Sequence, residues 1–184
     1  MTQFKPKNPD YDARVRNSFD RQKAMNTLGI SIAELLPGRI VLEMAHQVAL
    51  TQQHGFLHAG IVSTALDSAC GYAAFSLMPA DAAVLTAEFK INLLNPADGE
   101  RFRFVADVVK PGRTLTICEA RAYAVKGQDE KLVATMTGTL MALVGRTGVG
   151  GDDRTGAQTN PRAGLRGYAA GPFRWSIWEN PRTR

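Results

Sequence analysis

Residues 55–74 read GFLHAGIVSTALDSACGYAA, the longest stretch of helical periodicity in the chain. The pattern predicts a helix from about His58 to Met78, which Pro79 ends. Asp67 is the only acid in this helix, and it lies on a side made of small residues that let another backbone approach closely. That side consists of Gly60, Ser63, Thr64, Asp67, Gly71 and Ala74, whereas Ile61, Ala65, Ala69, Tyr72 and Ala73 form the core side.

Strand-like runs lie on both sides of this helix. Two short runs, 30–36 and 39–45, are joined by the turn residues Pro37-Gly38 and predict a hairpin. One long helix surrounded by six strands predicts an α+β fold, in which an antiparallel sheet wraps around a central helix. Short turns between the last four strands predict that these strands are antiparallel neighbours. The last four runs cover about 83–94, 101–109, 114–126 and 131–144, and an amphipathic helix is expected earlier, over 10–27.

The run over 83–94 alternates apolar and polar residues from Leu85 to Leu93. This period of two is typical of a strand with one polar face. The alternation places Thr86 on that polar face, together with Glu88 and Lys90.

Composition excludes several classes of protein. The chain has 184 residues and two cysteines, so a disulfide scaffold or a multi-cysteine zinc site is excluded. The N-terminal residues lack the apolar core of a signal peptide, and no run of about 20 apolar residues predicts a membrane span. The net charge is +3 over 1–28, −2 over 29–144 and +4 over 145–184. Because the basic charge lies at the ends, the sequence disfavours nucleic-acid binding by the folded body.

Charge and texture divide the chain into three segments. We expect an N-terminal helical segment over 1–27, a single domain over 28–144 and a basic Gly/Arg-rich tail over 145–184. The tail has too few apolar residues for a core of its own, so poor order is expected there. Only its aromatic end, 173–178, is apolar enough to pack on a surface.

Reactive residue types gather in 52–60, QQHGFLHAG, with Asp67 two turns further on. His54 and His58 are four residues apart, which suits metal binding only if both lie on one helix, and Gly55 between them argues against that. A second interpretation is purely structural, with His58 at a helix end and Asp67 as a buried polar residue. Both interpretations stay open from the residues alone.

A third interpretation is an acyl-transfer site. The start of the helix offers free backbone N–H groups at Ala59 and Gly60 for a developing oxyanion, and Asp67 offers a base or nucleophile. Asp67 lies about 13 Å of helical rise from His58, which is too far to act on the same atom within one chain. This spacing suggests that the two halves of a site come from two subunits of a symmetric dimer.

The stretch from Gly55 to Ala74 resembles the PaaI-like hotdog-fold thioesterases. The family pattern is approximately G-x-x-H-G-G with an Asp nine residues after the His, and His58 and Asp67 have that spacing. Residues 86–97, TAEFKINLLNPA, resemble the third strand of the family and its Pro-Ala turn, and 112–120, GRTLTICEA, resemble its G-R-x-L-x-x-x-E-A strand. The resemblance covers about 28–143 and implies a hotdog fold.

The resemblance implies a role for each matched residue. Asp67 matches the catalytic carboxylate, His58 the motif His at the helix start, and Ala59 the residue whose N–H polarises the thioester carbonyl. Gln52 matches a position that holds the thioester or the attacking water, and Thr86 matches a Ser/Thr that orients water. Ala59 stands where the family has Gly, so a methyl group intrudes on the pocket beside Gly60.

The implied activity is hydrolysis of medium- or long-chain acyl-CoA in the cytoplasm by a homodimer or homotetramer, without metal, cofactor or membrane. The polyanionic CoA suggests Lys90, Lys110 and Arg113 as substrate-binding cations, although each also suits ordinary surface charge. Two alternatives remain: a non-catalytic acyl-CoA sensor, and a hotdog dehydratase that uses a His–acid pair. Retention of Asp67 together with Gln52 and Thr86 favours the hydrolase.

Overall fold

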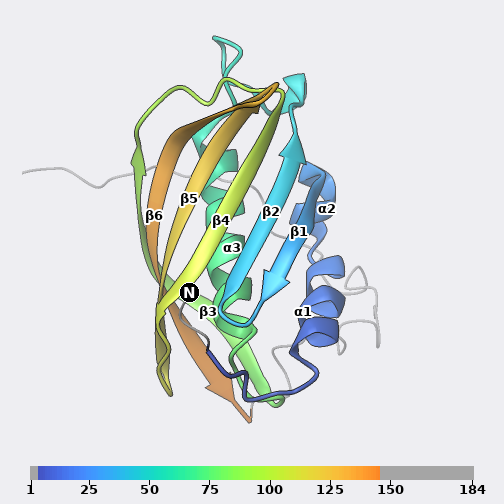
Figure 1. Ribbon diagram of the computed structural model, residues 1–184, viewed down its shortest axis with the longest axis vertical. Coiled ribbons are helices and arrows are strands. Elements are labelled where there is room, and N and C mark those ends of the chain that lie inside the picture. Colours follow the sequence, from blue (N-terminus) through green and yellow to red (C-terminus); the bar gives the residue numbers. More distant parts are fainter. Residues whose placement is uncertain (1–3, 146–184) are drawn as a thin grey trace, which may run out of the picture. The chain divides into compact units, whose positions relative to one another are not determined.

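The computed structural model describes residues 4–145, and the tail predicted over 145–184 lies outside this range from residue 146 onward. Within it, a six-stranded antiparallel sheet wraps around one long helix (Figure 1), which confirms the predicted fold class. No helix in the described range is long and apolar enough to span a membrane. The elements are α1 (Tyr11–Asp20), α2 (Lys23–Leu28), β1 (Ile30–Leu36), β2 (Arg39–Ala45), η1 (Val48–Leu50), α3 (Ala59–Phe75), β3 (Ala82–Leu93), β4 (Arg101–Lys110), β5 (Leu115–Lys126) and β6 (Asp129–Val144).

The order of strands across the sheet is β1-β2-β4-β5-β6-β3. The prediction that the last four strands are neighbours in chain order is therefore wrong for β3, which pairs with β6 at the edge of the sheet. The seven residues 94–100 are long enough to carry the chain past β5 and β6 to β4, whereas a hairpin needs only two to five residues. This crossover leaves the outer edge of β3 without a partner strand in residues 4–145.

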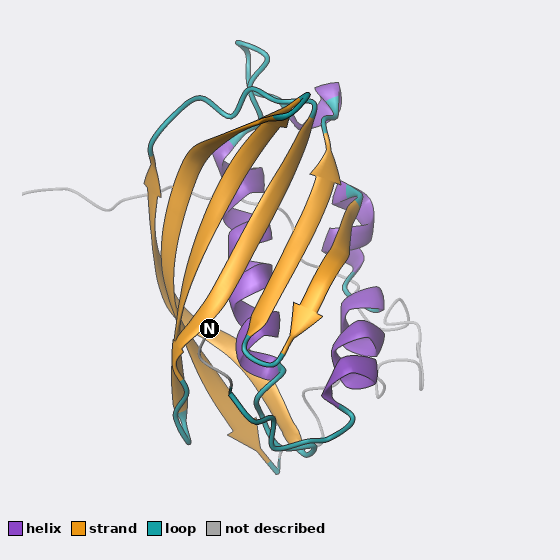
Figure 2. Ribbon diagram, in the orientation of Figure 1, coloured by secondary structure: helices purple, strands orange, loops and turns teal. Residues whose placement is uncertain are grey.

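The predicted N-terminal helix is two helices rather than one. Gln22 has extended backbone angles, φ −78° and ψ 93°, and separates α1 from α2. The break lets α1 pack beside β1 and α3, and α2 pack beside β1 (Figure 2). Phe19 packs on Tyr72 of α3 with ring centroids 5.4 Å apart, and Met25 is fully buried. Tertiary packing therefore overrides a helical pattern that is continuous in the sequence.

The long helix α3 runs through the concave side of the sheet, as predicted, and ends at Phe75. Ala65, Ala69 and Ala73 on its core side are completely buried. Gly138 of β6 helps the close approach, since a Cβ there would lie 3.4 Å from Cys70 Cβ. On the small-residue side, Asp67 and Gly71 are only partly buried by the described part of the chain.

A β-bulge at Ala87 corrects the predicted face of Thr86. Thr86 lies opposite Leu140, whereas Glu88 lies opposite the next residue, Thr139, so one extra residue is inserted into β3. Because directly opposed residues share a face, Thr86 points with buried Leu140 toward α3. Beyond the bulge the phase is reversed, and Phe89 shares this inner face with Gly138.

Candidate active site

The start of α3 presents one unused backbone donor. His58 is the N-cap, and its Nδ1 accepts a hydrogen bond from the Gly60 N–H at 2.9 Å. The N–H groups of Ile61 and Val62 donate to the His58 carbonyl at 2.9 and 3.2 Å. Within residues 4–145 the Ala59 N–H meets no acceptor. Ala59 is therefore the donor at this helix terminus that remains available for an oxyanion.

The cap also explains why Gly60 carries no side chain. A Cβ at Gly60 would lie 3.0 Å from His58 Nδ1, which is closer than ordinary van der Waals contact. The absence of a side chain at Gly60 therefore leaves room for the His58 imidazole that caps the helix. It also keeps the N-terminus of α3 accessible.

Replacing His58 with Ala is expected to lower the free energy of unfolding by about 1 kcal/mol, because the N-cap acceptor is lost. Asn at the same position retains a side-chain acceptor, so His58→Asn should keep most of that stability. Urea denaturation of the two variants and the wild type provides the measurement. Equal destabilisation by Ala and Asn would contradict the capping role.

The carboxylate of Asp67 is held by the neighbouring strand. The Thr86 hydroxyl donates a 2.7 Å hydrogen bond to Asp67 Oδ1, and within the described residues Oδ2 has no partner. The bulge at Ala87 is what turns Thr86 toward α3 and makes this contact possible. One oxygen of Asp67 is thus oriented while the other is left available for chemistry.

A cavity of about 270 Å³ lies beside the start of α3. Gln52 and Ala59 both line it, so the structure brings these two predicted site residues together. The loop between η1 and α3 is held by hydrogen bonds from the His58 N–H to the Leu50 carbonyl and from the Leu57 N–H to the Ala97 carbonyl. The remaining lining is mostly apolar: Phe56, Leu57, Val62, Leu93, Asn95, Pro96, Ala97 and Val133.

The two pairs of site residues are separated along α3. Asp67 follows Ala59 by eight residues, a helical rise of about 12 Å. Neither Asp67 nor Thr86 lines the cavity that contains Gln52 and Ala59. One chain therefore presents two candidate half-sites, one with the Asp67 carboxylate and one with the unused Ala59 N–H.

Comparisons with known proteins identify the family to which the chain belongs. The model of the thioesterase superfamily matches residues 54–131, a range that includes α3. A solved thioesterase family protein from Silicibacter pomeroyi is 67% identical, with a TM-score of 0.73 over 73% of this chain and 99% of that one. The chain belongs to the thioesterase superfamily. Its sheet and central helix are the hotdog fold, which confirms the resemblance to PaaI-like thioesterases.

More distant relatives agree with this thioesterase assignment. A Saccharolobus solfataricus protein provisionally named an esterase is 33% identical over 63% of this chain and 80% of its own length. The PaaI protein of E. coli, from the phenylacetic acid degradation operon, is 20% identical and shares the fold, with a TM-score of 0.66 over 73% of this chain and 94% of that one. The protein is thus a hydrolase of the thioesterase type.

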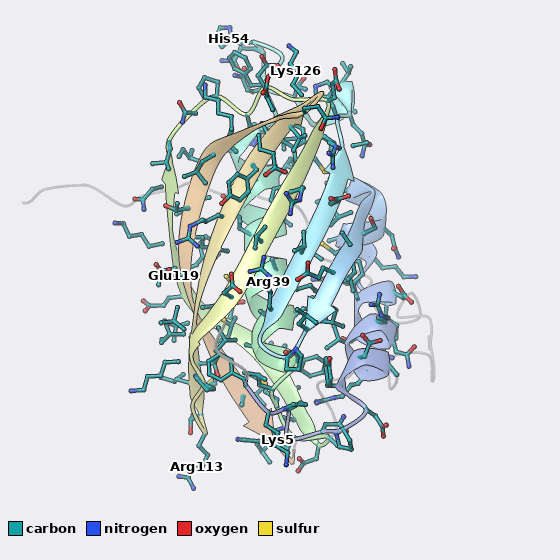
Figure 3. The ribbon with its side chains drawn as sticks, viewed as in Figure 1. Lys5, Arg39, His54, Arg113, Glu119 and Lys126 are labelled. Atoms are coloured by element: carbon teal, nitrogen blue, oxygen red, sulfur yellow. The ribbon has the colours of Figure 1, made fainter. Side chains whose placement is uncertain are left out.

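The three cations predicted to bind the substrate do not all lie together, because Lys90 is separate from Lys110 and Arg113. Arg113 lies at the end of the molecule opposite His54 (Figure 3). Lys110 ends β4, on the same side as Arg113, and Lys90 points outward from β3 opposite Thr137. The structure does not gather these three cations at the cavity of their own chain.

Metal and thiol chemistry find no support among the described residues. No cluster of three potential ligands occurs within 4–145, and α3 starts after His58, so His54 and His58 do not share a helical face. Cys70 and Cys118 are both buried. The hydrogen bond with Cys70, together with burial, raises the pKa of Cys118, which keeps it a neutral thiol.

The sequence alone did not indicate Phe56, Leu93 or Asn95 as lining residues. Leu93 and Asn95 lie far from Ala59 in sequence, and the strand order with its crossover over 94–100 brings them beside it, whereas Phe56 lies in the loop just before α3. The run Asn95-Pro96-Ala97 was the available signal, since turn residues next to a strand end often border sites.

Proposed function

We propose that the protein hydrolyses acyl-CoA thioesters at sites shared between two chains. The observation that carries this proposal is the pair of half-sites on α3. Asp67, oriented by Thr86, lies about 12 Å from the unused Ala59 N–H. A second chain that brings its Asp67 to this chain's Ala59 would complete the constellation that thioester hydrolysis requires.

In the proposed reaction the thioester carbonyl oxygen accepts a hydrogen bond from the Ala59 N–H. Asp67 of the other chain attacks the carbonyl carbon, or removes a proton from the water that does so. Negative charge develops on the carbonyl oxygen, where the helix N-terminus stabilises it. Collapse of the intermediate breaks the carbon–sulfur bond, and the CoA thiolate takes up a proton. In the nucleophilic route, water then hydrolyses the acyl–Asp67 anhydride.

The edge of β3 supports the proposed dimer. Among the described residues this edge has no partner strand, and its backbone groups are left unpaired there. Phe89 and Leu93 are 45% and 56% exposed although both lie on the inner face of the sheet, toward α3. A second copy that adds its own β3 would cover these side chains and bring the two helices' small-residue sides face to face.

The apolar lining of the cavity supports an acyl chain as the group bound there. Burial of each methylene contributes about 0.8 kcal/mol, which corresponds to about a fourfold gain in kcat/KM. We therefore expect kcat/KM to rise about fourfold for each added CH₂ from short to medium chains, and then to level off once the cavity is filled.

The test is a chain-length series of acyl-CoA substrates with spectrophotometric detection of the released thiol. A dicarboxylic acyl-CoA of matched length serves as the polar control and should be a poor substrate, because its carboxylate would be desolvated in the cavity. Absence of thiol release across the whole series would refute acyl-CoA hydrolysis. A flat chain-length profile would refute the assignment of the cavity to the acyl chain.

A further inference from the structure

The cavity beside the start of α3 has only two polar side chains in its described lining, those of Gln52 and Asn95. The other lining residues are alanine, valine, leucine, proline and phenylalanine, whose side chains form no hydrogen bonds. A polar group on a bound acyl chain must therefore be recognised by one of these two side-chain amides or by the backbone. The hydrogen bonds of the two amides decide which chemical group fits.

The amide of Gln52 leaves donors available at the cavity. Its oxygen, Oε1, accepts a hydrogen bond from the N–H of His54, which lies in the loop at one end of the molecule (Figure 3). This bond identifies the oxygen of the amide, since a backbone N–H can only donate. Nε2 meets no acceptor among residues 4–145. Gln52 and the Ala59 N–H thus both offer donors, which suits the carbonyl end of an acyl group.

The amide of Asn95 is oriented in the opposite sense. Its Nδ2 donates a 2.9 Å hydrogen bond to the Leu132 carbonyl, and its backbone N–H donates to the Val133 carbonyl at 3.3 Å. Because a carbonyl can only accept, the contact with Leu132 identifies the amide atom that faces β6 as the nitrogen. The oxygen Oδ1 is therefore directed away from this contact, and no donor meets it within the described part of the chain.

The backbone acceptors around Asn95 are already in use. The carbonyls of Pro96, Ala97 and Val133 each accept a backbone N–H, at 3.0, 3.1 and 2.8 Å. Among the lining side chains, Asn95 Oδ1 is thus the one acceptor without a donor in residues 4–145. An acceptor that loses water when a ligand binds, and gains no donor in exchange, destabilises the complex.

A lone acceptor selects among the groups that an acyl chain can carry. A carboxylate or an oxo group offers only lone pairs, so neither forms a hydrogen bond with Asn95 Oδ1. An ammonium group would donate, but no side chain of the described lining carries a compensating negative charge. A hydroxyl is neutral and can donate its proton to Oδ1. A neutral hydroxyl is therefore the substituent that fits this apolar cavity.

We propose that Asn95 makes the enzyme selective for hydroxyacyl thioesters, by accepting a hydrogen bond from a hydroxyl group on the acyl chain. This inference rests on the proposed function and names the class of acyl group for the same cavity. Asn95 is exposed in the single chain, and it follows the end of β3 directly. Pairing of two β3 edges would bring a second chain beside it, and the exclusion of water there would strengthen the hydrogen bond to the hydroxyl.

The first test compares three CoA thioesters of equal chain length: octanoyl-CoA, a hydroxyoctanoyl-CoA and the oxo compound with its oxygen at the same carbon. The substituent is moved one carbon at a time along the chain, with both enantiomers of each hydroxy compound. At the carbon that reaches Oδ1, kcat/KM for the hydroxy compound should exceed that for octanoyl-CoA about tenfold, the scale of a hydrogen bond between neutral groups. The oxo compound should be poorer than octanoyl-CoA. Equal kcat/KM for hydroxy and plain substrates at every position would overturn the proposal.

The second test removes the acceptor. Asn95→Leu lacks Oδ1 and has a side chain of similar size, so the preference for the hydroxy substrate should fall about tenfold, to a ratio near one. Both substrates are assayed with the same preparation, so the ratio does not depend on the fraction of folded enzyme. A preference that persists in Asn95→Leu would overturn the proposal. An equal loss for both substrates would also overturn it, because Asn95 would then contact a group common to both, such as a pantetheine amide.

Asn92→Leu is the matched control for this substitution. Asn92 also donates from Nδ2 to β6, to the Thr135 hydroxyl at 3.3 Å, but it lies on the outward face of β3. The control variant should therefore retain the ratio of the wild type. Loss of the preference in Asn92→Leu as well would overturn the assignment to Asn95, since any amide contact with β6 would then produce the effect.

The wild-type series separates this inference from the function on which it rests. Thiol release from octanoyl-CoA without a preference for any hydroxy compound would leave the proposed hydrolysis standing and overturn the role of Asn95. Absence of thiol release from every member of the series would refute the proposed function, and the inference with it.

Discussion

Replacement of Asp67 by Asn is expected to lower kcat for thioester hydrolysis by at least about a hundredfold, the scale of losing a general base or nucleophile. Asn keeps the size of the side chain and still accepts the hydrogen bond from the Thr86 hydroxyl, so the packing of α3 against β3 should persist. Steady-state thiol release and thermal unfolding of the same preparations provide the measurement. A folded variant with turnover near that of the wild type would exclude Asp67 as the catalytic carboxylate.

Two further variants make this result specific to the site. Asp129→Asn removes an exposed carboxylate at the start of β6 and should leave kcat unchanged. Thr86→Val removes the hydroxyl that orients Asp67 and should lower kcat, whereas Thr86→Ser retains the hydroxyl and should preserve most of it. Equal activity of the Val and Ser variants would show that this hydrogen bond does not position the carboxylate.

Phe89→Glu is expected to dissociate the dimer and abolish hydrolysis, with kcat/KM lowered at least about a hundredfold because neither half-site is complete alone. The substitution places a charge on the exposed inner face of β3, where the second copy is proposed to pack, and burying that charge would be costly. Light scattering should show the wild type at about twice the 20.0 kDa chain mass, and the variant at the mass of one chain.

The control for this experiment lies on the same strand. Asn92→Asp also adds a negative charge to β3, but Asn92 faces outward opposite Thr135 and should leave both mass and activity unchanged. Circular dichroism establishes whether each variant is folded. A dissociated, folded and fully active Phe89→Glu protein would contradict the shared site, and so would an active wild-type monomer.

Much of the fold follows from local sequence patterns. The hairpin of β1 and β2 has the predicted bounds, and α3 and the last four strands lie within three residues of theirs. These elements are predictable because periodicity and turn chemistry act over a few residues, and each agrees with the final packing. The N-terminal segment is different, since a continuous helical pattern is broken at Gln22 so that both halves can pack on the domain.

The candidate site shows the same division. The spacing of His58, Ala59 and Asp67 is a property of one helix, so the sequence by itself determined that the Ala59 N–H and the Asp67 carboxylate are separated by about 12 Å of helical rise. The sequence likewise determined the central helix and the number of strands around it. The sequence alone did not determine which residues lie beside the Ala59 N–H or the Asp67 carboxylate.

Tertiary structure alone decided which residues meet. The bulge at Ala87 reverses the faces of β3 and turns Thr86 toward Asp67, and a bulge depends on pairing with β6 rather than on the residues of β3 themselves. The crossover at 94–100 places β3 at the sheet edge and builds the cavity beside Ala59. The same topology puts Arg113 at the far end from that cavity. Such contacts arise from strand order and register, which are set by non-local pairing energies that no single stretch of the chain contains.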